Sequence, residues 1–371
     1  MTSVPAPAKP VRITEVRARV VSIPLARPLI VATFTLPAIG SVLVDVRTDA
    51  GASGLGWIFV FGAKRLRAIQ LLVEELGDLL IGEDALAIER CWQKMWKSIT
   101  FIGHSGAAVL AMAPLDTALW DIAGKVAGLP LYRLLGGARD RVEAYASEGL
   151  WLHLSVDELQ REAEGFLRRG FRAMKLRVGK PDPGEDLARV RAVRDAIGPG
   201  PKLMVDANQA WDVPTAIRRG RRLEEFDLTW IEEPLPYEDI EGCAAVAAAL
   251  DTPICTGETN YTSEDFRRMC QAGTADILMP DLMRMGGITE WLKAARLCQA
   301  FHRPVTPHLF MEASAHLVAA CPNAIWQEHM PWWEAILKEP VDFRYGMIHL
   351  RVRPGLGLEW DEKAVAKFAL R

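Results

Sequence analysis

The sequence predicts a modified TIM-type (β/α)8 barrel of the α/β class, capped by an N-terminal α+β domain. Three observations support this fold. Strand-like and helix-like segments alternate from about residue 142, apolar runs end abruptly in polar residues, and three of those ends, Asp206, Glu232 and Glu258, are spaced by 26 residues each time. One strand, one helix and two loops fill such a spacing. Eight strand-like runs favour a closed parallel barrel over an open sheet.

The composition of the 371-residue chain is ordinary for a globular enzyme, with 50% hydrophobic and 25% charged residues. A net charge of −3 with mixed signs supports neither nucleic acid nor an anionic membrane as a partner. Six scattered cysteines without a CxxC pair predict reduced thiols and a cytoplasmic location. No uninterrupted apolar run is long enough to predict a membrane span, and residues 1–10 are typical of a flexible lead-in.

Residues 1–138 are expected to form the capping domain. Strand-like runs predict an antiparallel meander at residues 11–23, 41–46 and 54–60. Helical periodicity follows at residues 66–80, 88–96 and 105–127. Pro114 lies inside the last of these helices and should kink or divide it.

Residues 139–338 are expected to form the barrel domain. Its candidate strands end near residues 147, 177, 206, 232, 258, 281, 308 and 328, with amphipathic helices at 156–169, 184–197, 214–225 and 287–301. Residues 339–371 lose the repeat and are expected to return to the capping domain. The chain has no glycine-rich phosphate loop, so nucleotide binding has no support.

Asp206, Glu232 and Glu258 should converge where the carboxyl ends of the barrel strands meet. Like charges so close are costly unless a cation joins them. Three carboxylates with room for water and substrate suit one Mg²⁺ better than Zn²⁺. The alternative is that each carboxylate only caps the helix that follows its strand.

Lys175 and Arg177 are two residues apart, so on a strand their side chains share one face. Inside a barrel that face points to the interior, where unpaired cations are costly and a carboxylate substrate would compensate them. The alternative is that both side chains extend from a frayed strand end into water.

Asp281 and His308 end neighbouring candidate strands, so the carboxylate can fix the imidazole tautomer and raise its basicity. A structural histidine is the alternative. Glu328 ends the eighth strand and could bond a substrate oxygen if its neighbours keep it protonated, or cap a helix. Together with the expected Mg²⁺, these groups suit removal of the proton α to a carboxylate to give an enediolate.

With these motifs in order, the chain resembles the enolase superfamily and, within it, the mandelate racemase/muconate lactonizing enzyme family. The resemblance extends through Asp-Thr-Ala-Leu-Trp-Asp at 116–121 and Leu-Leu-Gly at 134–136. It implies a homo-oligomer such as an octamer. It also implies the metal ligands Asp206, Glu232 and Glu258, the dyad Asp281–His308, the carboxylate-binding acid Glu328 and the substrate contacts Ser147 and Asn208.

One departure from the family pattern concerns the second strand, where Lys-x-Lys is common and this chain has Lys175-Leu176-Arg177. Arginine is a poor base, and a racemase needs a base on each face of its substrate. A single base suits β-elimination of water, so the resemblance implies an acid-sugar dehydratase. A racemase or epimerase of a 2-hydroxy acid, a lactone cycloisomerase, a barrel that binds an anion and Mg²⁺ without turnover, and a Schiff-base aldolase using Lys175 are the alternatives.

The resemblance also implies that cap loops near residues 31–40 and 57–64 shape the substrate pocket. Trp57 and, from another part of the cap, His104 are the expected contacts. These loops are mostly apolar, whereas each buried hydroxyl of a long sugar acid needs a hydrogen-bond partner. The expected substrate is an aldonic or aldaric acid. The apolar loops are evidence against this choice and keep an aromatic or short-chain 2-hydroxy acid, or a compact lactone, as alternatives.

Overall fold

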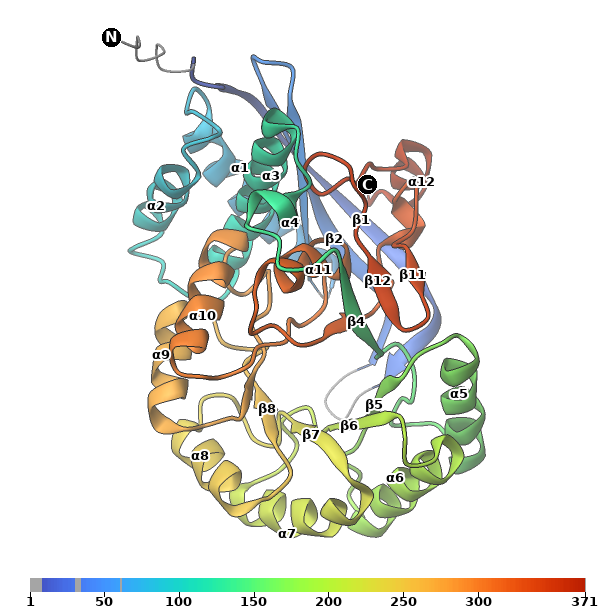
Figure 1. Ribbon diagram of the computed structural model, residues 1–371. Coiled ribbons are helices and arrows are strands. Elements are labelled where there is room, and N and C mark those ends of the chain that lie inside the picture. Colours follow the sequence, from blue (N-terminus) through green and yellow to red (C-terminus); the bar gives the residue numbers. More distant parts are fainter. Residues whose placement is uncertain (1–8, 31–34, 61, 371) are drawn as a thin grey trace, which may run out of the picture.

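The capping part of the molecule is a three-stranded antiparallel sheet with helices packed on it (Figure 1). The computed structural model describes residues 9–30, 35–60 and 62–370. The strands are β1 (Ile13–Ile30), β2 (Thr35–Thr48) and β3 (Ser53–Phe59), and the helices are α1 (Ala63–Leu80), α2 (Ile88–Ser98), α3 (Ala107–Ala127) and α4 (Leu131–Leu134). β1 and β2 are longer than the sequence predicted, and residues 31–34 and 61 of the expected pocket loops lie outside the described residues.

Helix α3 is the central helix of this cap, and it runs unbroken past Pro114, so the predicted division there is wrong. Tight packing on the sheet accounts for this, because tertiary contacts outweigh the local cost of a proline. Gly54 and Gly56 of β3 touch the backbone of α3: a Cβ at either position would lie 2.0 Å from a carbonyl oxygen. The helix has the length and composition of a membrane span, but 78% of that window is buried inside the protein.

The barrel consists of parallel strands arranged in chain order around a ring. They are β4 (Arg141–Ala146), β5 (Ala173–Arg177), β6 (Lys202–Asp206), β7 (Leu228–Glu232), β8 (Ile254–Thr256), β9 (Ile277–Leu278) and β10 (Gln327–His329), and β10 pairs with β4 to close the ring. The predicted barrel is confirmed. Its seventh strand is reduced to isolated bridges, Val305 to Leu278 and His308 to Asp281, because the prolines at 304 and 307 cannot donate to a ladder.

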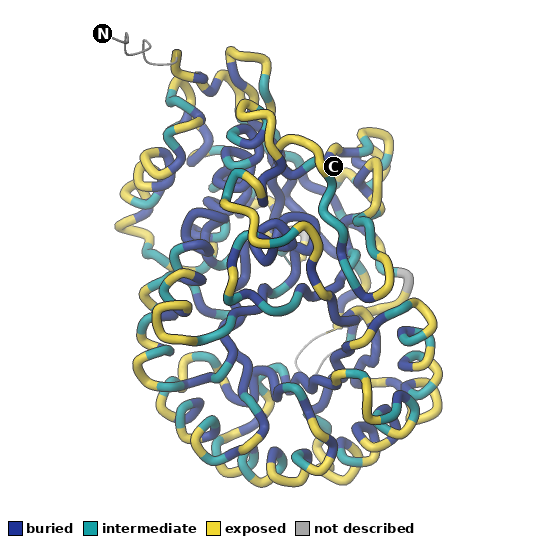
Figure 2. The backbone as a smooth tube through the Cα atoms, in the orientation of Figure 1, coloured by how far each residue is buried: buried dark blue, intermediate teal, exposed yellow. Residues whose placement is uncertain are grey.

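Helices cover the outside of this ring, and all of them except the buried α11 carry exposed residues on their outer faces (Figure 2). They are α5 (Val156–Arg168), α6 (Pro183–Ile197), α7 (Val213–Leu223), α8 (Ile240–Ala249), α9 (Ser263–Ala272), α10 (Ile288–Ala300) and α11 (Met311–Ala320), with short 3₁₀ turns at Glu224–Phe226 and Glu334–Ile336. Side-chain oxygens cap α5 to α9 at their N-termini, which satisfies backbone donors that have no partner within the helix.

A plug of buried side chains fills the barrel interior below the carboxyl ends of the strands. It consists of Tyr145, Ala173, Met204, Trp230, Cys255, Ile277 and Met279. Trp230 and Tyr145 pack edge to face, with ring centroids 5.4 Å apart. The polar groups above this plug therefore stand on a rigid apolar floor.

The C-terminal segment contacts both parts of the molecule. β11 (Phe343–Arg344) and β12 (Met347–His349) form a hairpin, and β12 pairs antiparallel with β4. Helix α12 (Glu362–Phe368) lies against β1, and the Leu370 N–H donates to the Val20 carbonyl at 3.0 Å.

Two buried carboxylates of α3 bind elements on three sides of it. Asp116 accepts from the backbone and hydroxyl of Thr289 at the start of barrel helix α10, at 2.9 and 2.6 Å. Asp121 accepts from the N–H groups of Leu55 on β3 and Leu356 in the C-terminal segment, at 3.1 and 2.8 Å. The Asp-Thr-Ala-Leu-Trp-Asp motif thus ties cap, barrel and C-terminal segment together.

Candidate active site

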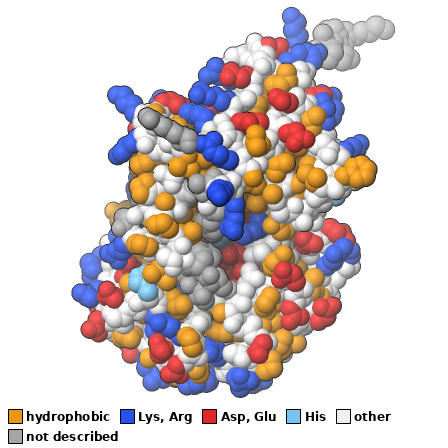
Figure 3. All heavy atoms as spheres, turned by 180° about the vertical axis from the view of Figure 1, so that it is seen from behind, with side chains coloured by type: hydrophobic (Ala, Val, Ile, Leu, Met, Phe, Trp, Pro, Cys, Tyr) orange, Lys and Arg blue, Asp and Glu red, His pale blue; other side chains and the backbone are white. Residues whose placement is uncertain are grey.

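A cavity of about 230 Å³ lies between the cap and the carboxyl ends of the barrel strands. Its apolar surface comes from both parts of the molecule, namely Leu29, Phe59, Trp151, Leu309, Met330 and Trp332. Charged side chains supply most of the rest of the cavity lining. The space-filling view shows the surface hollowed between cap and barrel, with acidic side chains inside the hollow (Figure 3).

Strand register brings the predicted charged residues close together: Asp206 and Glu258 line the cavity, whereas Glu232 is fully buried and does not line it. Arg177, Asp206 and Glu232 are direct partners across β5, β6 and β7, so their side chains leave the sheet at one level. Glu258 follows β8 by two residues, beyond Gly257, whose φ of 130° favours glycine. The sequence spacing of 26 residues therefore does bring the three carboxylates to one rim, as predicted.

Lys175 is buried at the centre of these carboxylates. Its ammonium contacts Glu232 and lies 3.4 Å from Asp206 Oδ2 and 3.1 Å from Glu328 Oε1. Burial lowers the pKa of Lys175, but the three carboxylates outweigh burial and raise that pKa well above its usual range. Lys175 is therefore a fixed cation in this arrangement, not a neutral amine.

The predicted metal ligands offer carboxylate oxygens only. Burial raises the pKa of Glu232 to about 8, with further increases from Asp206 and Glu258 that Lys175 only partly offsets. No three acidic, histidine or cysteine side chains in the described ranges form a ready-made metal cluster, and Lys175 is paired with two of the predicted ligands, Asp206 and Glu232. The donor type and the excess negative charge nevertheless fit a hard divalent cation.

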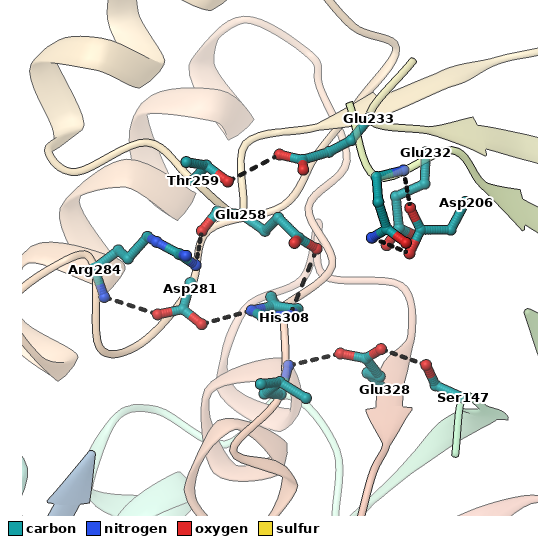
Figure 4. A network of polar contacts seen from close by, with 12 residues as sticks. Ser147, Asp206, Glu232, Glu233, Glu258, Thr259, Asp281, Arg284, His308 and Glu328 are labelled. Atoms are coloured by element: carbon teal, nitrogen blue, oxygen red, sulfur yellow. Dashed lines mark hydrogen bonds and ion pairs between the residues drawn. The ribbon is translucent and has the colours of Figure 1, made fainter. Parts of the chain in front are cut away.

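His308 and Asp281 form a hydrogen-bonded pair, with Nδ1 and Oδ2 2.6 Å apart (Figure 4). The other ring nitrogen, Nε2, faces the cavity and lies 3.5 Å from Glu258 Oε2. Burial alone would lower the pKa of His308, but the carboxylates of Glu258 and Asp281 outweigh it and raise the pKa to about 9. Neutralising Glu258 would remove the largest contribution that raises this pKa, bringing the imidazole closer to the range of a base.

The neighbours of Glu328 favour its ionised form rather than the protonated form considered from the sequence. Burial alone would raise the pKa of Glu328, but Lys175 and His308 reverse this and lower it to about 2. The carboxylate accepts hydrogen bonds from Ser147 Oγ at 2.5 Å and from the Leu309 N–H at 2.8 Å. It is an acceptor beside the cavity, and it also fixes the backbone next to His308.

Arg177 is held by strand β4. Its guanidinium donates to the Ser147 carbonyl at 2.6 Å and to Ser147 Oγ at 3.0 Å, and it lies 4.2 Å from the ring centre of Trp151. The side chain still lines the cavity. These contacts suit a fixed positive charge, as expected from the departure in the second-strand motif.

Of the other predicted substrate contacts, one lines the cavity and three do not. Asn208 lines the cavity, and its Oδ1 has no hydrogen-bond partner among the described residues. Ser147 is fully buried behind Glu328 and Arg177 and does not line the cavity. Trp57 packs against Phe310 at the start of α11, between cap and barrel, and His104 stacks on Trp96. The structure thus does not bring Ser147, Trp57 or His104 to the cavity surface; Phe59, two residues after Trp57, lies there instead.

Four polar residues that were not singled out from the sequence form a wall of the cavity: Gln209, Glu233, Thr259 and Arg284. Glu233 accepts hydrogen bonds from Gln209 Nε2 at 2.7 Å and from Thr259 Oγ1 at 3.2 Å. Each of the four lies one to three positions after a predicted ligand or dyad residue, in the loop that follows a strand. That position in the loops was the sequence signal that could have found them.

Family models match most of the chain. A model described as mandelate racemase/muconate lactonizing enzyme, N-terminal domain, matches residues 13–136, and one described as enolase C-terminal domain-like matches residues 158–364. This chain belongs to the mandelate racemase/muconate lactonizing enzyme family of the enolase superfamily. The family assignment made from the sequence is therefore confirmed.

Individual members of this family are similar over nearly their whole length. L-talarate/galactarate dehydratase of Salmonella typhimurium is 39% identical, covering 95% of this chain and 90% of that protein. 3,6-anhydro-α-L-galactonate cycloisomerase of Streptomyces coelicolor is 36% identical, covering 89% and 91%. A crystal structure of L-talarate dehydratase from Polaromonas sp. JS666, complexed with Mg and L-glucarate, has a TM-score of 0.90 and 39% identity, covering 97% and 98%.

Proposed function

We propose that this family member is a Mg²⁺-dependent acid-sugar dehydratase, which removes the proton α to a carboxylate and eliminates the β-hydroxyl as water. One observation carries the proposal. The cavity offers one oriented base, His308 held by Asp281, while the second-strand position that provides a base in the family's Lys-x-Lys pattern is Arg177. A single base supports elimination but not proton exchange at both faces of a carbon.

The ligands for Mg²⁺ in this proposal are Asp206, Glu232 and Glu258. Their oxygen-only donor set and the raised pKa of Glu232 support the assignment, as does the bound Mg in the similar L-talarate dehydratase structure. When bound, the ion supplies positive charge that makes the α-proton more acidic. Lys175, which contacts the same carboxylates, adds a second positive charge next to the substrate carboxylate.

His308 Nε2 accepts the α-proton while Asp281 holds the Nδ1 tautomer. The electron pair of the broken C–H bond forms the new carbon–carbon double bond as the β-carbon–oxygen bond breaks. The departing hydroxyl takes the proton from His308 and leaves as water, and the enol product becomes a 2-keto-3-deoxy acid. Asn208 Oδ1, which has no partner among the described residues, accepts from a substrate hydroxyl.

The second candidate is a racemase, epimerase or lactone cycloisomerase. The apolar surface of Leu29 and Phe59 favours it, because it suits a compact ring more than an open polyol. The similar cycloisomerase from Streptomyces coelicolor shows that such activity occurs among relatives. Exchange of the α-proton without net loss of water would distinguish this candidate from a dehydratase.

The test is an assay for 2-keto product with a panel of aldonic and aldaric acids in Mg²⁺, using semicarbazide. We expect a signal that EDTA abolishes and that His308→Asn lowers by about 10³-fold or more, because the variant loses the base. Ser98→Ala, far from the cavity, is the matched control and should retain activity. Absence of product with every acid, together with α-proton exchange in D₂O, would replace the dehydratase proposal with the second candidate.

We also propose that the protein is a cytoplasmic homo-oligomer. The six cysteines are free thiols, which supports a reducing compartment. Phe101 and Ile102, between α2 and α3, are largely exposed and support an interface between subunits, whereas Trp332 and Trp333 are buried against Phe59. Analytical ultracentrifugation would decide the oligomeric state, and an octamer is the assembly expected from the family.

A further inference from the structure

Arg284 is a cavity-lining cation whose hydrogen-bonding capacity is mostly unused. It follows β9, and its backbone N–H donates to Asp281 Oδ1 at 2.7 Å. Among the described residues its guanidinium makes one hydrogen bond, from Nη1 to the Glu258 carbonyl at 2.8 Å (Figure 4). A guanidinium carries five N–H donors. No carboxylate in the described part of the chain lies within ion-pairing distance of this one.

The other two cations of the cavity are already engaged. Lys175 is surrounded by the carboxylates of Asp206, Glu232 and Glu328. Arg177 donates from its Nη atoms to the carbonyl and hydroxyl of Ser147, and its Nε, which has no hydrogen-bond partner among the described residues, lies 3.8 Å from Asp206 Oδ2. Arg284 is therefore the cavity cation with the most unused N–H donors, while the nearby carboxylates of Asp281, Glu258 and Glu233 surround it with negative charge.

The position of Arg284 places it at the far side of the ring from Lys175 and Arg177. β5 is the second strand of the barrel and β9 the sixth of eight positions, so their carboxyl ends lie opposite each other. His308 stands between them, on the position after β9. A substrate whose reacting carboxylate lies near Lys175 would point its other end toward Arg284.

The residues beside Arg284 suit a polar end of a substrate. Thr259, Gln209 and Glu233 line the same wall. Thr259 and Gln209 already donate to Glu233, and the oxygens of all three side chains can accept hydrogen bonds from substrate hydroxyls. The apolar lining of Leu29 and Phe59 comes from the cap, on another side of the cavity. The cavity therefore has one hydrogen-bonding wall that ends in a positive charge.

We propose that Arg284 binds a second carboxylate at the distal end of the substrate, and so makes this protein selective for aldaric acids over aldonic acids. The proposal rests on the proposed function and specifies its substrate class. A planar guanidinium can hold a carboxylate by two parallel hydrogen bonds, which the terminal hydroxymethyl group of an aldonic acid cannot reproduce. Loss of that pair leaves the guanidinium unpaired again.

The test compares acids that differ at one end only, such as galactarate with galactonate and glucarate with gluconate. We expect the wild-type protein to prefer the diacid of at least one pair in kcat/KM by about 10- to 100-fold, the value of a charge-assisted bidentate pair. In Arg284→Gln, kcat/KM for the diacid should fall by that factor, mainly because KM rises. The kcat/KM for the monoacid should change little. Arg284→Lys, which keeps the charge without the planar fork, should recover part of the preference.

Binding measured without turnover separates this proposal from the proposed function. Calorimetric titration of both acids into His308→Asn, and into the same variant with Arg284→Gln, gives the diacid preference even if no water is eliminated. Because Arg284 donates to the Glu258 carbonyl, the Mg²⁺ affinity of each variant is measured as a control for displacement of Glu258. Equal weakening of both acids, or no diacid preference in the presence of the arginine, would overturn the role of Arg284. Absence of keto product with normal diacid binding would overturn the dehydratase alone.

Discussion

Trp230 controls the orientation of one carboxylate from below the cavity. It lies two residues before Glu232 on β7, so the two side chains share one face of the strand. Its indole Nε1 donates to Glu232 Oε2 at 2.9 Å, which directs the other oxygen, Oε1, to Lys175. In the proposed metal site, such an outer partner would orient Glu232 as a ligand.

Replacing Trp230 with Phe should weaken Mg²⁺ binding by about tenfold, because Glu232 loses the donor that orients it. Titration calorimetry of the free protein measures this directly. The matched control is Tyr145→Phe, which removes a hydroxyl that has no hydrogen-bond partner in the described structure and packs against the same indole. An equal loss of affinity in both variants would mean that the plug, and not the indole N–H, sets the ligand geometry.

His316 should make the protein less stable in acid. Burial lowers the pKa of His316 to about 4, whereas an unfolded histidine titrates near 6.5. Between these values the unfolded chain binds a proton that the folded one does not, so stability falls as pH drops from about 6.5 to about 4. The shift corresponds to about 3 kcal/mol. Urea unfolding at pH 7 and 4.5 should show a smaller pH effect for His316→Gln than for wild type; equal effects would contradict this assignment.

At the scale of secondary structure, the contact between β3 and α3 is so close that it requires glycine. A Cβ on Gly56 would lie 2.0 Å from the Pro114 carbonyl oxygen, and one on Gly54 equally close to that of Ala118. Backbone cannot yield as a flexible side chain can. This contact explains why β3 carries two glycines despite their low strand preference, and it positions Phe59 at the cavity.

Gly56→Ala should destabilise the fold by about 1–3 kcal/mol or more, through the forced separation of β3 from α3. Gly165→Ala is the matched control. Gly165 lies in α5 with its nearest neighbour, an Arg168 nitrogen, 3.8 Å from the position of a new Cβ, so alanine should stabilise that helix by about 0.5–1 kcal/mol. Urea midpoints of the two variants should move in opposite directions. Similar shifts for both would show that α3 and β3 separate at little cost.

At the scale of the whole molecule, the sequence was most informative where a local pattern decides the structure. Strand ends and the even spacing of Asp206, Glu232 and Glu258 predicted the barrel and its charged rim, because parallel strands bring equivalent positions together. Local patterns could not predict the contacts of Trp57, His104 and Ser147. Whether a side chain faces the core or the cavity depends on packing between cap and barrel, which no local pattern contains.

The sequence also did not predict which side chains interact. The ionisation of Glu328 depends on Lys175 from a strand 153 positions earlier in the chain, and the isolated donors of Arg284 depend on which carboxylates do not reach it. The division of α3 at Pro114 was wrong for the opposite reason, since the local rule was overridden by the sheet against which α3 packs. Long-range contacts, not strand or helix preference, set these details.

The two buried carboxylates of α3 have a consequence for cooperativity. Asp116 bonds Thr289 of the barrel, and Asp121 bonds Leu356 of the C-terminal segment. If the cap melted first, α10 would lose its acceptor and the N–H of Leu356 its partner, both in interior positions where unmet polar groups are costly. The cap is thus not an independent lid with its own melting point. Cap and barrel should unfold together, as one endothermic transition in calorimetry.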